Sequence, residues 1–168
     1  MMPKSKNSRY YQDWLTKAKR DLDTAILNQR HGGYTDTTCY FCQQVAEKVL
    51  KSYLLFKGIK SLPRIHILSA LLSLCKEKDG SFSQLEEACQ ILDRYYIETK
   101  YPASPPIDYS KKEAEKAIGL AEEILKFVEE KLKVERLAGS VAIPRKQKGL
   151  SANQMIRQAK QEYFKKRG

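Results

Sequence analysis

The 168-residue sequence predicts an all-α fold, an up-and-down antiparallel bundle of about five helices followed by a C-terminal basic helical tail. Apolar residues recur every three or four positions in five successive stretches, which is the spacing of a helix with one buried face. No stretch alternates apolar and polar residues for long enough to predict a strand. The connections between the five stretches are short, which favours antiparallel neighbours.

The first predicted helix covers about residues 10–30 and ends at a pair of glycines, and the second covers about 36–56. Gly58 suits the end of the second helix because glycine adopts the left-handed cap without strain. The apolar stripe of the second helix is too wide for a surface helix, so we expect this helix to be the centre of the bundle. That stripe contains Cys39, Cys42, Ala46, Val49, Leu50, Tyr53 and Leu54.

The third, fourth and fifth predicted helices cover about residues 65–78, 83–99 and 110–137. The fourth and fifth each begin with a Ser-x-x-Glu capping box, in which two side chains satisfy backbone N–H groups at the helix start. We therefore expect residues 9–138 to form the bundle. Residues 139–168 should form a linker and a short basic tail helix.

The net charge of +11 is concentrated near the C-terminus. Residues 131–168 contain 11 Lys or Arg and 2 Asp or Glu, so the preceding 130 residues are nearly neutral. Any attraction of a polyanion should therefore depend mainly on the tail. No apolar run is long enough to span a membrane, and no secretory signal is visible. We expect a cytoplasmic protein with no transmembrane segment.

The four cysteines do not form a metal-site pattern. Cys39 and Cys42 are close in sequence, but Cys75 and Cys89 are too far apart to provide a second close pair. Cys39 and Cys42 also fall on the apolar stripe, so we expect small buried thiols. The sequence predicts neither a metal site nor a cofactor.

Four segments carry a resemblance to a known family. They are Trp14-x3-Ala18-x2-Asp21-Leu22; Cys39-Tyr-Phe-x-Gln43-Gln44-x-Ala46-Glu47-Lys48-x-Leu50-Lys51 with Leu54-x3-Gly58; His66-x-Leu68-x2-Leu71-Leu72; and Leu92-Asp93-x-Tyr95-Tyr96-Ile97-x2-Lys100-Tyr101-Pro102. Over about residues 10–135 the chain resembles the HEPN domain family. The resemblance implies a helical bundle that usually dimerises. It also implies an association with nucleotides or RNA, often beside a small nucleotidyltransferase encoded next door.

Many active members of that family are metal-independent ribonucleases, and their signature bears on Arg94. In them an arginine near the end of the fourth helix is followed four to six residues later by a histidine. Arg94 matches the arginine, but residues 98–101 read Glu-Thr-Lys-Tyr, and the only histidines are His31 and His66. The usual acid–base group for RNA cleavage is therefore absent from the motif.

Three residues around the second and third helices are candidate ligand contacts. Lys48 and Lys51 are neighbours on successive turns and could present two ammonium groups to a phosphate. An ordinary solvated face with local ion pairs is the alternative. His66, expected in the first turn of the third helix, is either a polar ligand contact at the bundle mouth or a histidine that bonds a loop.

The remaining candidates lie around the proline-rich loop after the fourth helix. Arg94, Lys100, Tyr101 and Tyr109 interleave cations with aromatic rings, a composition that suits a nucleotide or single-stranded nucleic acid. The alternative is that the tyrosines fill the end of the bundle while the cations are solvated.

These observations leave three hypotheses for function. The first is a non-catalytic nucleotide- or RNA-binding or interaction module, a homodimer paired with a nucleotidyltransferase-type partner in the manner of a toxin–antitoxin system. The second is a ribonuclease toxin with a degenerate or relocated active site. The third is a purely structural interaction protein.

Overall fold

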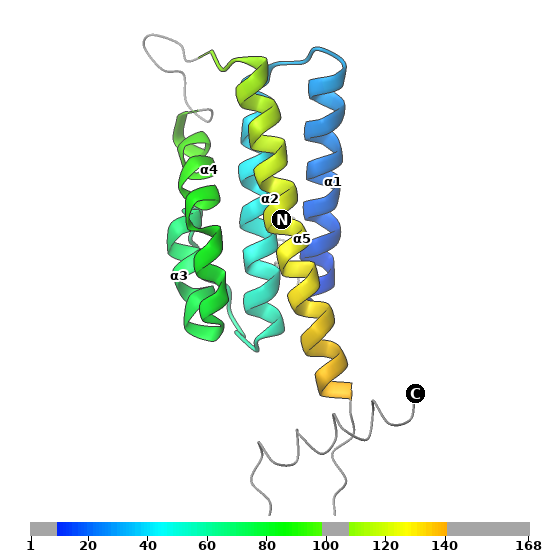
Figure 1. Cartoon of the computed structure of the whole chain (residues 1–168), viewed down its shortest axis with the longest axis vertical. Coiled ribbons are helices and arrows are strands. Elements are labelled where there is room, and N and C mark those ends of the chain that lie inside the picture. The colour runs from blue at the N-terminus through cyan, green and yellow to red at the C-terminus, as the bar shows by residue number, and fades with distance from the viewer. Residues whose placement is uncertain (1–9, 99–107, 141–168) are drawn as a thin grey trace, which may run out of the picture. The chain divides into compact units, whose positions relative to one another are not determined.

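The computed structural model describes residues 10–98 and 108–140, and within them it confirms the all-α fold. Figure 1 shows the helices. The elements in chain order are α1 (Tyr11–Arg30), α2 (Thr35–Phe56), α3 (Leu68–Lys78), the 3₁₀ helix η1 (Gly80–Leu85), α4 (Glu86–Glu98) and α5 (Lys111–Ser140). No helix among these residues is both long enough and apolar enough to cross a membrane.

The chain divides into two compact units, residues 1–129 and 130–168, with the boundary inside α5. In the first unit α2 is the central helix, because it packs against α1, α3 and α4 (Figure 1). In the second unit the described residues are the last turns of α5, where Val134 and Leu137 are exposed. The predicted tail helix lies outside the described residues, and the boundary expected at residue 138 stays a prediction.

The core of the first unit is built on the predicted stripe of α2, and all seven of its residues are completely buried. An aromatic cluster extends this core: the rings of Tyr53 and Phe82 lie 4.4 Å apart, and Phe82 meets Phe127 of α5 edge-on at 5.0 Å. Burying a large apolar side chain contributes about 1.5–3 kcal/mol each, so this cluster is a main source of stability.

The start of α5 is fixed by hydrogen bonds to the turn between α1 and α2. Thr35 Oγ1 donates to the carbonyl of Tyr109 (2.7 Å), and Gln29 Nε2 donates to the carbonyl of Lys111 (3.2 Å). The Ser110 hydroxyl caps the helix as predicted, since it accepts from Glu113 N–H at 3.1 Å. These bonds place the end of the proline-rich segment beside α1 and α2.

Two helix starts differ from the prediction. The third helix begins at Leu68 rather than near residue 65, because Ile67 is extended and the capping group comes from a distant residue, Asp93. The fourth helix is preceded by η1, which Asp79 caps by accepting from Ser81 N–H at 2.9 Å. His66 therefore lies two residues before α3 and not in its first turn.

Candidate functional site

Most of the polar face of α2 is buried, and its charged side chains form the local ion pairs that the alternative interpretation also expected. Gln43 is completely buried, and Glu47 and Lys51 are each only 5% exposed. Two parts of the chain contact this face. One is α1, through Asp21, and the other is the segment after α2, through His66. Burying charged groups is costly unless they are paired, so the contacts they make decide what the site can do.

The first ion cluster is centred on Asp21 of α1. This carboxylate, which is 2% exposed, pairs with Lys17 Nζ at 2.6 Å and with Lys48 Nζ at 2.8 Å. Lys48 also donates to Gln44 Oε1 at 3.0 Å. The ammonium group of Lys48 therefore already has two partners inside the protein.

The second ion cluster is centred on Glu47 of α2. Its Oε1 atom lies 2.8 Å from Lys51 Nζ and 3.1 Å from His66 Nδ1. Lys51 also lies 5.8 Å above the Trp14 ring, a cation–π distance. Glu47 thus joins a buried lysine to a histidine whose side chain is 49% exposed.

His66 is held from three directions. Glu47 bonds its Nδ1, Gln43 Nε2 donates to its carbonyl at 2.9 Å, and its ring stacks on Tyr96 of α4 at 5.3 Å with an angle of 9° between the planes. An ionised carboxylate can only accept, so Nδ1 carries the proton in the bond to Glu47. In a neutral ring this leaves Nε2 as an acceptor, which is the arrangement of an oriented general base.

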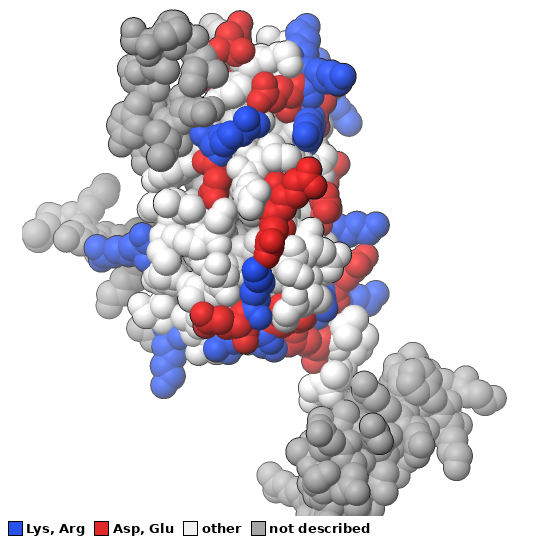
Figure 2. Space-filling view, turned by 60° about the vertical axis from the view of Figure 1, so that its left-hand side comes forward, with Lys and Arg blue, Asp and Glu red and all other residues white. Residues whose placement is uncertain are grey.

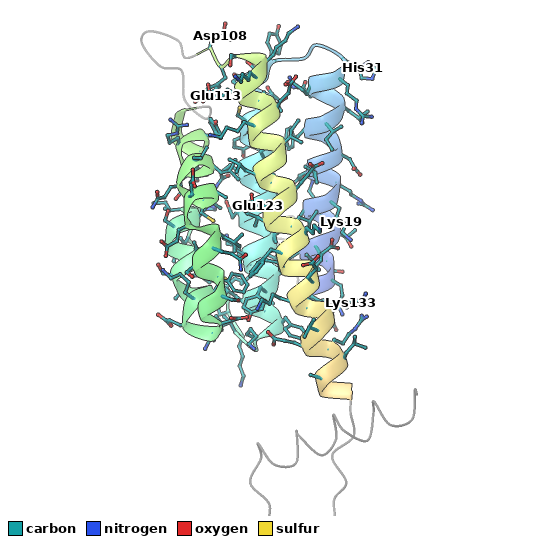
Figure 3. All side chains as sticks on the ribbon, viewed as in Figure 1. Lys19, His31, Asp108, Glu113, Glu123 and Lys133 are labelled. Carbon is teal, nitrogen blue, oxygen red and sulfur yellow. The ribbon has the colours of Figure 1, made fainter. Side chains whose placement is uncertain are left out.

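A separate cluster joins the end of α4 to the start of α5. Tyr95 donates its phenol proton to Glu113 Oε1 at 3.1 Å, and Arg94 Nη2 lies 3.7 Å from the same oxygen. Figure 3 shows Glu113 in the first turn of α5, on the side that faces α4. The Tyr95 ring meets Tyr109 edge-on at 5.1 Å. Burial, with the charge of Glu113 as a smaller cause, raises the pKa of Tyr95, so its phenol stays a proton donor.

The cluster around Glu113 and the cluster around Glu47 and His66 lie on different sides of α4. Arg94 and Tyr96 are two positions apart, which places their side chains about 200° apart around a helix. Arg94 contacts Glu113 of α5, whereas Tyr96 contacts His66. The structure therefore separates His66 from the arginine that matches the ribonuclease motif.

The structure brings together some of the predicted site residues and separates others. Gln44 joins Lys48 to the cluster of Lys51 and His66, because it accepts from Lys48 Nζ and donates to Glu47 Oε2 at 3.5 Å. Arg94 and Tyr109 belong to the separate cluster around Glu113. Lys100 and Tyr101 lie outside the described residues.

The sequence did not identify as ligand contacts several residues that build these clusters. Four of them lie in the segments that carry the family resemblance, namely Trp14, Asp21, Glu47 and Tyr96, and Glu113 lies in the predicted capping box. One signal was available for Asp21. It lies in the apolar register of α1 between two buried residues, Ala18 and Leu22, and a charge there indicates a buried ion pair.

The cysteines are buried thiols, as predicted. Burial raises the pKa of Cys39 to about 12, so its thiolate, the form that reacts and binds metals, is suppressed. Among the described residues no group of three or more His, Cys, Asp or Glu side chains could hold a metal ion.

Charge is mixed on the face of the described chain that Figure 2 shows. Figure 2 shows Lys and Arg interspersed with Asp and Glu and separated by uncharged residues. Such a surface has no broad field of one sign, which agrees with the near-neutral body. Any anion site here must therefore depend on a few specific side chains.

Comparison with known proteins finds the same family. The model of the HEPN domain matches residues 11–131. The crystal structure of TT1696 from Thermus thermophilus is 37% identical, with a TM-score of 0.64 over 72% of this chain and 97% of that one. That of ST0689, an archaeal HEPN homologue, is 29% identical, with a TM-score of 0.61 over 73% of this chain and 98% of that one.

A relative in Methanocaldococcus jannaschii carries the name "Putative toxin MJ1304". It is 26% identical over 141 residues, which cover 76% of this chain and 91% of the relative. The match therefore extends over nearly the whole length of that protein.

Proposed function

Because the chain belongs to the HEPN domain family, we propose that it is a nucleotide- or RNA-binding module that does not itself cleave RNA. The observation that carries this proposal is the surroundings of Arg94. Its side chain is 56% exposed and its ion pair with Glu113 is loose, at 3.7 Å, so the guanidinium can reach a phosphate. The acid–base groups that contact it are Tyr95 and Glu113, and no imidazole is among them in the described residues.

The proposed binding residues divide into direct contacts and positioning residues. Arg94 and His66 have exposed side chains suited to direct contact, and Lys100 and Tyr101 join them on sequence grounds. The ion pairs of Lys48 and Lys51 and the burial of Tyr109 instead favour positioning roles.

We propose a homodimer that works with a nucleotidyltransferase-type partner and acts in the cytoplasm, in the manner of a toxin–antitoxin pair. Family membership and the name of the M. jannaschii relative support this proposal. Light scattering at micromolar concentration tests the dimer, and co-purification with the product of a neighbouring nucleotidyltransferase gene tests the pairing.

A second candidate is a ribonuclease whose active site has moved to His66. The favouring observation is the Glu47–His66 pair, since a carboxylate that orients an imidazole is the usual support of a general base. Against it, Arg94, the arginine that matches the ribonuclease motif, contacts Glu113 on another side of α4 and is separated from His66. An RNA-cleavage assay on the wild type and on Arg94→Ala and His66→Ala separates the two candidates.

The binding proposal is tested by fluorescence anisotropy with a labelled single-stranded RNA. Arg94→Ala should weaken binding and reduce the slope of log affinity against log salt by about one, as expected for one lost phosphate contact. The matched control is Arg20→Ala, because Arg20 is an exposed arginine on α1. Equal effects of the two variants would contradict a site at Arg94.

A further inference from the structure

The orientation of the His66 ring is fixed although half of its side chain is exposed. Its carbonyl, its Nδ1 atom and one ring face are engaged by Gln43, Glu47 and Tyr96. Asp93 secures the next turn by accepting hydrogen bonds from Leu68 N–H and from Ser69 N–H, the latter at 2.9 Å. An exposed side chain normally samples several rotamers, so this one is preorganised.

The partners of His66 are themselves fixed. Glu47 is buried and paired with Lys51, and Gln43 is completely buried. Neither residue can follow the ring if it swings away, so the ring keeps the plane that Tyr96 sets. Two flat rings in parallel, one of them half exposed, form a surface on which a third flat ring can stack.

We propose that a nucleobase stacks on the exposed part of the His66 ring, while Arg64 pairs with the adjacent phosphate. The proposal rests on the nucleotide- or RNA-binding function proposed above and names the part of the ligand that this site takes. Stacking on an aromatic face is open to every base, so the site favours unpaired bases without reading their sequence.

Arg64 supplies the cation for the phosphate. It is exposed and precedes His66 by two residues, so their Cα atoms are at most about 7 Å apart. Lys48 is already paired with the carboxylate of Asp21, and Lys51 is already paired with that of Glu47. Among the exposed cations of this segment, Arg64 is nearer to His66 along the chain than Lys60 is, so it is assigned to the phosphate beside the stacked base.

Stacking and proton transfer make different demands on His66. A stacking ring needs its flat face, whereas a general base needs Nε2. Phenylalanine keeps a flat aromatic face but has no Nε2. The His66→Phe variant therefore separates this proposal from the relocated ribonuclease.

The test measures the affinity of the full chain for fluorescein-labelled oligoadenylate and for an abasic strand with the same number of phosphates. The wild type should bind the oligoadenylate about tenfold more tightly, because stacking of one base on an aromatic side chain is worth roughly that factor. His66→Ala should abolish the preference, and His66→Phe should keep most of it. Arg64→Ala should weaken both ligands without changing their ratio.

The control is Ile67→Ala, which alters an exposed neighbour, and unchanged thermal melting shows that each variant is folded. Competition by adenosine monophosphate distinguishes a free nucleotide from RNA as the source of the base. Equal affinity for the two strands, or a preference that survives His66→Ala, would overturn the stacking site and leave RNA binding intact. Binding of neither strand would overturn the proposed function as well.

Discussion

Asp93 of α4 caps the N-terminus of α3 through Ser69. The carboxylate accepts from Ser69 N–H at 2.9 Å and from Ser69 Oγ at 2.7 Å, and it also accepts from the N–H of Leu68. A negative charge at a helix N-terminus satisfies free N–H groups and favours the helix dipole. Because His66 directly precedes this turn, the cap also helps to place the candidate site.

We predict that Asp93→Ala destabilises the protein by about 2 kcal/mol, the upper range for loss of an N-cap. The control is Glu87→Ala, which removes an exposed acid from the same helix and should change stability by less than about 0.5 kcal/mol. Urea unfolding measures both. A similar small effect of the two substitutions would show that the cap does not fix α3.

We predict that Lys51→Met destabilises the protein by about 3–5 kcal/mol, because it removes the closest cation from buried Glu47. The double variant Glu47→Leu/Lys51→Met should recover part of the loss, since it leaves no unpaired buried charge. Lys76→Met, which breaks a more exposed pair with Glu86, should cost less than about 1 kcal/mol. A double variant less stable than the single one would contradict this account.

We predict that alkaline pH destabilises the fold through its buried thiols. Burial raises the pKa of Cys39, Cys75 and Cys89 from 9.0 to about 12, and it raises that of Cys42 as well. Between the unfolded and the folded pKa values, the folded state therefore keeps thiol protons that the unfolded state releases. Their stabilising effect is complete below about pH 8.5 and is lost as the pH rises toward 12.

Urea unfolding between pH 7 and 10 measures this loss. Each thiol can contribute up to about 1.4 kcal/mol per pH unit. Cys75→Ala should have a shallower dependence than the wild type, even though its stability at pH 7 is lower. If the unfolding free energy depends on pH with the same slope in both proteins, the Cys75 thiol does not contribute to the alkaline destabilisation.

We predict that removing residues 139–168 leaves the melting temperature of the bundle unchanged. The same deletion should weaken RNA binding and its salt dependence, because most of the net charge lies in this part of the sequence. Earlier melting of the shortened chain would show that the bundle needs these residues and that the boundary expected at residue 138 is wrong.

The fold was largely predictable because helix period and capping signals are local. The stripe of α2 identified the core, and the Ser110 capping box identified the start of α5. The start of α3 was missed by a few residues, since its cap is Asp93, which lies 25 residues after Leu68 and gives no local signal. Such a contact depends on how α3 and α4 pack.

The sequence identified several residues of the candidate site, but it did not show which of them contact one another. Lys48, Lys51 and His66 were selected, yet the two ammonium groups are already paired with Asp21 and Glu47, and Glu47 also bonds the His66 ring. The helical period of 3.6 residues shows which side chains share one face of α2. It does not show which segment of the chain packs against that face when the segment itself is not helical. The segment before α3 does so, and it makes His66 a fixed ring.

The most direct test of the central claim is an RNA-cleavage assay without metal, on the wild type and on Arg94→Ala and His66→Ala. Cleavage needs one group to take the 2′-hydroxyl proton and another to protonate the leaving 5′-oxygen. A guanidinium is too basic to exchange protons, and the raised pKa of Tyr95 keeps its phenol protonated, so no phenolate is available to act as the base. We therefore predict binding without cleavage by all three proteins. Cleavage that co-purifies with the wild type and disappears in either variant would contradict the binding-module account.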